Sequence, residues 1–364
     1  MDLRKYQIIV NLPLVITAVG IIIGSIFGDI KVIFLLWISF NFVLAIYAGI
    51  IFRKFLRTLR KTQSIKSSDF SVVSEFMKIL IPMACISVLV PLNSNIDNFF
   101  ITILVPIETV AIYIATFKLA FMINEISRPF SHTLLSSLTY SYAQNEKPFK
   151  RALGFTLRIT LSILLLALIV VTPISPIIVK ILFGTNYLSG YILLPIFIAC
   201  GIILTINSLF WTISIVLRRV NTYLRALIIT TIMRLSAYVG LIWFKTQINL
   251  WIPLVLASLV FLSHVFMLLL ILILFKDIIS HYARDLLKIS LLAIPLISVD
   301  ILLLLFQIKL ITIGIIILVL SFVYVIALLK TDSIKMLDLI ILRRALPRKL
   351  WFLVNILSAV KRKI

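Results

Sequence analysis

The sequence predicts an all-α fold, a polytopic transmembrane bundle of about ten helices. Hydrophobic residues make up 62% of the chain and the mean hydropathy is +1.20, whereas soluble domains are only about half apolar. The apolar residues form long continuous runs rather than the alternating segments of about ten residues that are typical of membrane β-barrels. Most of the charged residues lie between these runs. Together these observations indicate a helical membrane protein.

The apolar runs give the predicted membrane-spanning helices in chain order. A helix needs about 20 apolar residues to cross the hydrocarbon core, and a helix satisfies its own backbone hydrogen bonds there. The first run is long enough to span and lacks a small-residue cleavage site, so we expect a helix and no signal peptide. The predicted spans are 6–28, 32–52, 79–105, 109–131, 155–179, 188–217, 226–244, 250–275, 289–306 and 310–329.

The connections between these spans differ in charge from one side to the other. The chain ends and the loops at 53–78, 140–154, 218–225 and 276–288 carry 27 of the 35 Lys and Arg residues. The connections on the opposite side hold four. Because short cytoplasmic loops are rich in Lys and Arg, we expect a multi-pass protein of the cytoplasmic membrane with both termini in the cytoplasm.

Two segments are basic and amphipathic instead of spanning: 53–78 and 335–364. The second places a run of basic residues beside Trp351 and its apolar neighbours. Such segments bind the anionic lipids of the inner leaflet, which is the interpretation we favour. Docking of a cytoplasmic partner, such as a glycan-assembly protein, is the alternative.

The sequence lacks the motifs of several functional classes of protein. The formal net charge of +22 lies in membrane-side loops, which argues against a nucleic-acid-binding protein. Cys85 and Cys200 lie in apolar runs without the spacing of a metal or disulfide site. The sequence shows no nucleotide-binding loop, metalloprotease motif or catalytic triad. We therefore expect a non-enzymatic protein without catalytic residues, metal or cofactor.

Polar and charged residues are most frequent within the third and fourth predicted spans. They are Asn93, Asn95, Asp97, Lys118, Asn124, Glu125 and Arg128. Lys118 and Glu125 lie seven positions apart on one helix face, and Arg128 is three residues beyond Glu125, within pairing distance. Charges at this depth usually face water or a partner, so we expect a polar cavity. Alternatively, Glu125 neutralises Arg128, and Lys118 extends towards the membrane surface.

Arg234 is the other cation deep within a span, and no acidic residue lies within four positions of it. It needs water, an anion or a distant partner. Lys118 and Arg234 together would suit a phosphate or diphosphate head group, because Arg binds phosphate through two parallel hydrogen bonds and Lys binds it as a point charge. The alternative is a structural ion pair between Arg234 and either Asp97 or Asp300.

Residues 81–144 carry four sequence features of a known family. They are IPMACISVLVPLNSNIDNFFI with Asp97, the turn PIETVAIY with Tyr113, ATFKLAF with Lys118, and SRPFSHTLLSSLTYSYAQNE. With these features the chain resembles the O-antigen type polysaccharide flippases of the multidrug/oligosaccharidyl-lipid/polysaccharide exporter superfamily. Further along, ILFGTNYLSGYILLPIFIACGIILTINSLF is similar to that family's next helix pair, with an outward turn at Phe183 and Gly184.

The resemblance implies a two-lobed transporter that flips a polyprenyl-(pyro)phosphate-linked oligosaccharide between leaflets by alternating access. The implied division is a remnant of the first lobe with its basic linker at 1–78, a six-helix second lobe at 79–275, two additional helices at 276–330 and a basic tail at 331–364. The first lobe is then short by about four helices. The implied head-group ligands are Lys118, Arg128 and Arg234. Polar cavity or helix contacts are assigned to Asn93, Asn95, Asp97, Tyr113, Asn124 and Glu125.

Two other functions fit parts of the same pattern. A cation-coupled multidrug exporter of this superfamily would use acidic residues to bind its substrates, and Asp97 and Glu125 are the central candidates. A more distant alternative is a membrane enzyme or a non-transporting subunit of a glycan-export complex.

Overall fold

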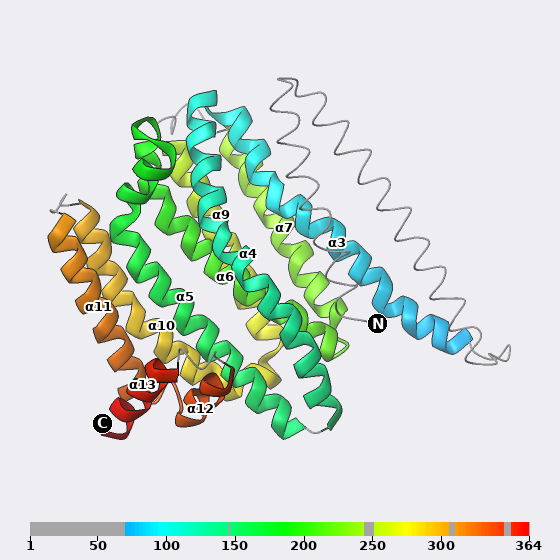
Figure 1. The fold of residues 1–364 in the computed structure, drawn as a ribbon. Coiled ribbons are helices and arrows are strands. Elements are labelled where there is room, and N and C mark those ends of the chain that lie inside the picture. The colour runs from blue at the N-terminus through cyan, green and yellow to red at the C-terminus, as the bar shows by residue number, and fades with distance from the viewer. Residues whose placement is uncertain (1–69, 145, 244–250, 306–309, 346–350, 364) are drawn as a thin grey trace, which may run out of the picture. The chain divides into compact units, whose positions relative to one another are not determined.

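The computed structural model describes residues 70–144, 146–243, 251–305, 310–345 and 351–363, and the regular elements in these ranges are all helices (Figure 1). The predicted all-α class is therefore confirmed for the described part of the chain. The elements are α3 (Phe70–Leu104), α4 (Ile107–Gln144), α5 (Glu146–Phe183), the 3-10 helix η1 (Thr185–Ile192), α6 (Leu193–Val216), α7 (Val220–Trp243), α9 (Ile252–Leu274), α10 (Lys276–Leu305), α11 (Leu310–Lys330), α12 (Met336–Ala345) and α13 (Trp351–Lys363).

Six described segments are long and apolar enough to cross a membrane. They are Met77–Leu104, Lys147–Phe183, Thr185–Val216, Val220–Trp243, Ile252–Leu274 and Thr312–Lys330. Each of them overlaps a predicted span. The predicted span 109–131 falls within α4, and the predicted span 289–306 overlaps α10 as far as Leu305; the side chains of both helices are described only in part. The predicted spans 6–28 and 32–52 lie outside the described residues.

The residues from Met77 to Ile364 form one compact unit, with α6 at its centre. The sequence of α6 is apolar on all sides, which is typical of a helix surrounded by others. It packs against α4 and α9, and also against α5 and α7 (Figure 1). Aromatic rings fill the contact with α4, where Phe197 meets the edges of Tyr113 and Phe117 at centroid distances of 4.9 and 5.3 Å.

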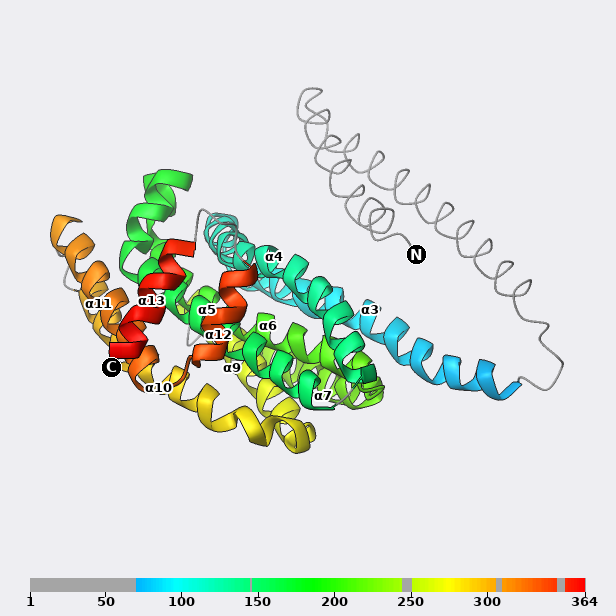
Figure 2. The same cartoon turned by 60° about the horizontal axis from the view of Figure 1, so that its bottom comes forward.

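The helices after α9 pack on the side of the unit formed by α5. α10 packs along α5, and α11 packs against both of them. After α11 the chain turns at Asp332, whose φ of 60° is in the left-handed region. The two views place α12 and α13 across the end of the bundle where α10 begins and α11 ends (Figures 1 and 2). The amphipathic tail predicted at 335–364 thus contains two helices that fold back onto the bundle.

Two connections near the opposite end follow the local sequence. Only Val105 and Pro106 separate α3 from α4, and the Pro106 carbonyl accepts the first hydrogen bond of α4 from Val110 N at 3.1 Å. α5 ends at Phe183, and Gly184 has φ of 85°, a conformation that glycine adopts without steric cost. The turn expected at Phe183 and Gly184 is therefore present.

Candidate functional site

A buried cluster of polar side chains joins α3, α7 and α9 inside the predicted membrane region. Asn93 and Asp97 are four residues apart on α3, and Arg234 and Tyr238 are four residues apart on α7. This spacing places each pair on one helix face. Asp97 and Arg234 are 1% and 3% exposed. At such burial an isolated charge would be very costly, so the arrangement of partners decides what these residues do.

Arg234 is held by partners from two other helices. Its Nε donates to Ser263 Oγ of α9 at 2.8 Å, and its Nη1 donates to the Asn93 backbone oxygen of α3 at 3.0 Å. Nη1 also lies 3.7 Å from Asp97 Oδ1. The Tyr238 hydroxyl donates to the same Asp97 oxygen. The guanidinium group thus has both a counter-ion and hydrogen-bond acceptors, which makes a buried cation tolerable.

The contact between Arg234 and His264 fixes the state of the imidazole. Arg234 Nη2 lies 3.2 Å from His264 Nε2. A guanidinium group can only donate hydrogen bonds. His264 Nε2 must therefore accept, so we assign the neutral ring with its proton on Nδ1. His264 acts here as a packed hydrogen-bond acceptor, the role that a single histidine within a helix most often has.

The sequence allows two interpretations of Arg234: a cation that faces an open cavity, or a structural ion pair with Asp97 or Asp300. In this conformation Arg234 is paired with Asp97 and is enclosed. Asp300 lies elsewhere, on α10, where it is 0% exposed and both carboxylate oxygens lack a partner among the described residues. Arg234 would therefore reach a head group only after the pair with Asp97 opens.

Lys118 has the opposite environment. Its side chain is exposed, and the described part of the chain offers it no ion pair or hydrogen bond. It lies about 16 Å along α4 from Ile107, at about 1.5 Å per residue, which is close to half of the hydrocarbon thickness. Its neighbour Phe117 points into the core. The structure does not bring Lys118 and Arg234 together, because one is on the surface of the unit and the other is inside it.

The other candidate residues fall into different environments. Tyr113 is 0% exposed, stacks on the core aromatics and has a hydroxyl group without a partner in the described ranges. Asn93 is buried, and its side-chain oxygen is likewise unpartnered there. The backbone at Asn124, Glu125 and Arg128 is helical, but their side chains are outside the described part of the structure.

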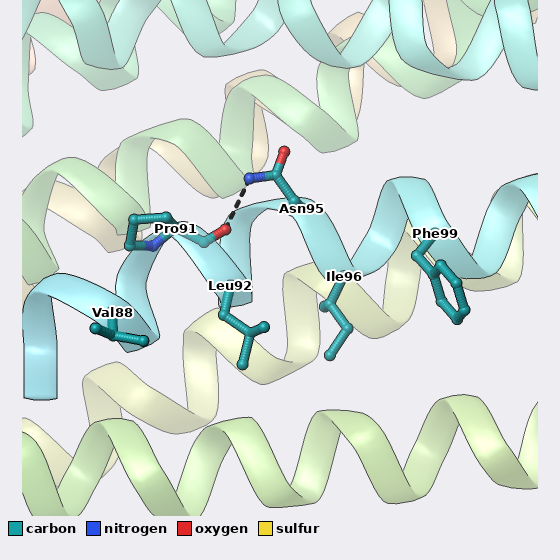
Figure 3. Close-up of a pocket in the computed structure, with 6 residues that line it drawn as sticks. All are labelled: Val88, Pro91, Leu92, Asn95, Ile96 and Phe99. Carbon is teal, nitrogen blue, oxygen red and sulfur yellow. Dashed lines mark hydrogen bonds between the residues drawn. The ribbon is translucent and has the colours of Figure 1, made fainter. Parts of the chain in front are cut away.

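Asn95 is exposed and lines a groove along α3 (Figure 3). Its Nδ2 donates to the Pro91 carbonyl at 2.8 Å. The other lining side chains, Val88, Leu92, Ile96 and Phe99, are apolar, and the groove has a volume of about 510 Å³. A groove of this composition on a membrane helix suits hydrocarbon better than a polar head group.

Sequence reasoning missed two members of the buried cluster, Tyr238 and Ser263. Tyr238 is one helical turn after Arg234, so the spacing of four residues was a usable signal. Ser263 had no such signal, because its contact with Arg234 joins two helices. The described residues contain no group of His, Cys, Asp and Glu that could hold a metal ion.

No family model, curated protein or solved structure matches this chain.

Proposed function

We propose that this chain is a multi-pass transporter of the cytoplasmic membrane that flips a polyprenyl-(pyro)phosphate-linked oligosaccharide by alternating access. The observation that carries the proposal is Lys118, which is exposed about midway along the predicted span of α4 and has no ion pair or hydrogen bond among the residues that the structure describes. A Lys at the bilayer centre costs about 2.5 to 3.5 kcal/mol on insertion scales, so it normally faces water or an anion. The phosphate group of a lipid carrier is an anion that occurs at a membrane.

The buried cluster supplies the second part of the proposed mechanism. With Arg234 bound to Asp97, the only cation offered to a head group by the described site residues is Lys118. Separation of the pair would free Arg234 for bidentate contact with phosphate. In this mechanism Lys118 binds the head group first. Arg234 binds it in a second state, in which the ion pair between Arg234 and Asp97 is open. Arg128 remains a candidate ligand on the same helix as Lys118.

The charge pattern of the sequence supports the remaining parts of the proposal. The excess of Lys and Arg in alternate connections favours cytoplasmic termini. The resemblance of residues 81–144 to polysaccharide flippases favours a glycan carrier as substrate. Partners would then be the lipid-linked oligosaccharide, anionic lipids of the inner leaflet and glycan-assembly proteins.

The test is transport by the purified chain in liposomes that contain a fluorescent polyprenyl-pyrophosphate-linked sugar. Lys118→Gln should reduce the flipping rate at least about tenfold, which corresponds to the loss of one charge-assisted contact. Lys180→Gln is the matched control, because Lys180 is an exposed lysine in the last turn of α5. Equal rates for parent and Lys118→Gln would overturn the head-group assignment.

The same liposomes distinguish the alternatives. Ion-gradient-dependent efflux of cationic drugs that survives Lys118→Gln would favour a multidrug exporter, although Asp97 is already occupied by Arg234 and Tyr238. Absence of any transport, together with copurification with a glycosyltransferase, would favour a non-transporting subunit.

A further inference from the structure

A second buried ion pair attaches the C-terminal helices to the bundle. Arg158 of α5 donates from Nε to Asp338 Oδ2 at 2.9 Å and from Nη2 to Asp338 Oδ1 at 2.7 Å. Asp338 belongs to α12, and both side chains are almost fully buried, at 7% and 2% exposure. This bidentate geometry is the strongest form of an Arg–carboxylate contact. It fixes both the position and the orientation of α12 on α5.

The neighbouring residues complete this attachment. Arg158 Nη1 lies 3.5 Å from Asp285 of α10, and Lys335 Nζ lies 3.2 Å from the same carboxylate. Asp338 Oδ2 also accepts from the backbone N–H of Lys335 at 2.9 Å, so the residue that binds Arg158 also caps the start of α12. One network of charged side chains therefore joins α5, α10 and α12.

Gly154 leaves the space that this network needs. A Cβ at this position would be 2.6 Å from the ring of Tyr282 and 3.1 Å from Arg158 Nη1. The Tyr282 hydroxyl donates to the Lys150 carbonyl at 2.7 Å, which fixes the ring over α5.

A separate set of contacts attaches α13. Lys361 Nζ lies 2.6 Å from Asp332 Oδ1 in the turn after α11, and it also donates to the carbonyl of Ile334. Leu329, Leu339 and Val354 form a small apolar core between α11, α12 and α13. With the inner face of α13 occupied in this way, its opposite face has no partner among the residues that the structure describes.

That outer face combines exposed apolar and cationic side chains. Phe352 and Ile356 are each 56% exposed, although they are large apolar residues one turn apart. Arg362, near the end of α13, is exposed as well. On α12, Ile340 and Arg343 are exposed, and the Arg343 guanidinium group lies 5.0 Å from the centre of the Trp351 ring.

The charge of the whole segment has one sign. Residues 335–364 contain eight Lys and Arg residues and one acidic residue, Asp338. Arg158 neutralises that single carboxylate inside the bundle, so the outward charge of the segment is entirely positive in the described ranges. Exposed apolar residues among cations are the pattern of a helix that lies in the interface of an anionic membrane.

We propose that α12 and α13 form a foot that binds the anionic phospholipid surface, held at the end of the bundle by the Arg158–Asp338 pair. The foot is defined by Met336–Ala345 and Trp351–Lys363. It follows directly on α11, an apolar helix that ends with Lys330 in its last turn. A foot connected by so short a turn to a spanning helix lies at the level of the lipid head groups. Phe352 and Ile356 then enter the acyl boundary, while Arg343 and Arg362 contact phosphate.

The experiment uses the full chain, in which Cys85→Ala and Cys200→Ala remove the native thiols. An environment-sensitive fluorophore is then attached to the single cysteine of Ile356→Cys. The protein is placed in nanodiscs of phosphatidylcholine alone or with added phosphatidylglycerol. We expect blue-shifted emission, quenching by brominated acyl chains, and an increase of both with phosphatidylglycerol. A label on Phe352→Cys should respond in the same way. A label on Glu108→Cys, an exposed position in the first turn of α4, should not respond.

The charge requirement is tested with Arg343→Gln and Arg362→Gln combined, which should abolish the response to phosphatidylglycerol while the size-exclusion profile stays that of the parent. Emission typical of water in both kinds of nanodisc would overturn the proposal, as would an undiminished response of the double variant. The result is independent of the transport assay, because it requires no substrate.

Discussion

Arg234 Nη1 lies 3.0 Å from the backbone oxygen of Asn93 and 3.7 Å from the carboxylate of Asp97, so one guanidinium group of α7 contacts a single turn of α3. Its other donors contact Ser263 and His264 of α9. The three helices are therefore joined by one charge at a depth where water does not compete for hydrogen bonds. Such a contact is strong only while it is complete, since removal of either charge leaves the other unpaired.

Arg234→Gln should destabilise the protein by about 3 to 5 kcal/mol, because it leaves the carboxylate of Asp97 buried without its cation. The measurement is thermal unfolding in detergent, followed by tryptophan fluorescence. Arg225→Gln is the matched control, since Arg225 is exposed on the same helix. Adding Asp97→Asn to Arg234→Gln should recover part of the lost stability. If the double variant is no more stable than Arg234→Gln, the two residues are not energetically coupled.

Tyr238→Phe should also destabilise the protein, by about 1.5 to 3 kcal/mol, because the lost hydroxyl donates to a charged acceptor, Asp97. Tyr324→Phe should be neutral or slightly stabilising. Tyr324 is equally buried, at 0% exposure, but its hydroxyl group has no partner among the described residues. Both variants keep the aromatic ring, so the difference between their melting temperatures reports the contribution of the Tyr238–Asp97 hydrogen bond to stability. Equal shifts for the two variants would contradict a stabilising role of this hydrogen bond.

The helices could be predicted from the sequence because hydrophobicity and helix length are local properties. The six described membrane-crossing segments each overlap a predicted span. The surroundings of Arg234 could not be predicted in the same way. The sequence identified it as a cation without a nearby counter-ion, but the choice between Asp97 and Asp300 depends on which helices meet. Asp97 is 137 positions away (234 − 97), and a single sequence contains no signal of that contact.

The contacts of the C-terminal helices could not be predicted from the sequence either. Their basic and amphipathic character was evident, but the role of Arg158 was not, since Asp338 is 180 residues further along the chain. Lys118 was predicted to line a polar cavity, because a charge within a membrane span usually faces water or a partner. Its side chain is exposed in the structure, and its role in a cavity stays a prediction. Local patterns were therefore sufficient to predict the helices, whereas both buried ion pairs depend on the tertiary arrangement.

Gly190 and Gly240 should respond in opposite ways to replacement by alanine. A Cβ at Gly190 would be 2.5 Å from Thr116 Oγ1 and 3.0 Å from Ile112 Cγ2. Thr116 is β-branched and its hydroxyl donates to the Ile112 carbonyl at 2.8 Å, so it cannot move freely. Gly190→Ala should cost about 1 to 3 kcal/mol.

A Cβ at Gly240 would meet nothing within 4 Å. Gly240→Ala should be neutral or stabilising by up to about 1 kcal/mol through the higher helix propensity of alanine. Thermal unfolding of the two variants side by side tests both statements. A loss of stability in Gly240→Ala as large as that in Gly190→Ala would show that the close approach of η1 and α4 is not the cause.

Asp338→Asn should detach the foot, whereas Asp277→Asn should have little effect. Both carboxylates bind an arginine, but the Arg158–Asp338 pair is buried and the Arg219–Asp277 pair is exposed, with side chains 43% and 53% accessible. Exposed pairs contribute about 0 to 1 kcal/mol. Limited trypsin digestion at neutral pH measures the difference, because Arg343 and Arg362 lie in the foot. Equal digestion of the two variants would contradict the role assigned to Arg158.

Acidification should loosen α13 through Asp332. The hydrogen bond and charge of Lys361 hold the pKa of the Asp332 carboxyl below its usual value. A depressed pKa means that the pair contributes stability above the ordinary Asp pKa of about 4 and loses it as the pH falls through the lower, folded-state pKa. Because Asp332 is 81% exposed, the contribution is small. A spin label on Ala359→Cys should therefore become moderately more mobile below about pH 4. Asp332→Asn should show that mobility at neutral pH and lose its pH dependence, whereas an unchanged pH profile in this variant would assign the loosening to another group.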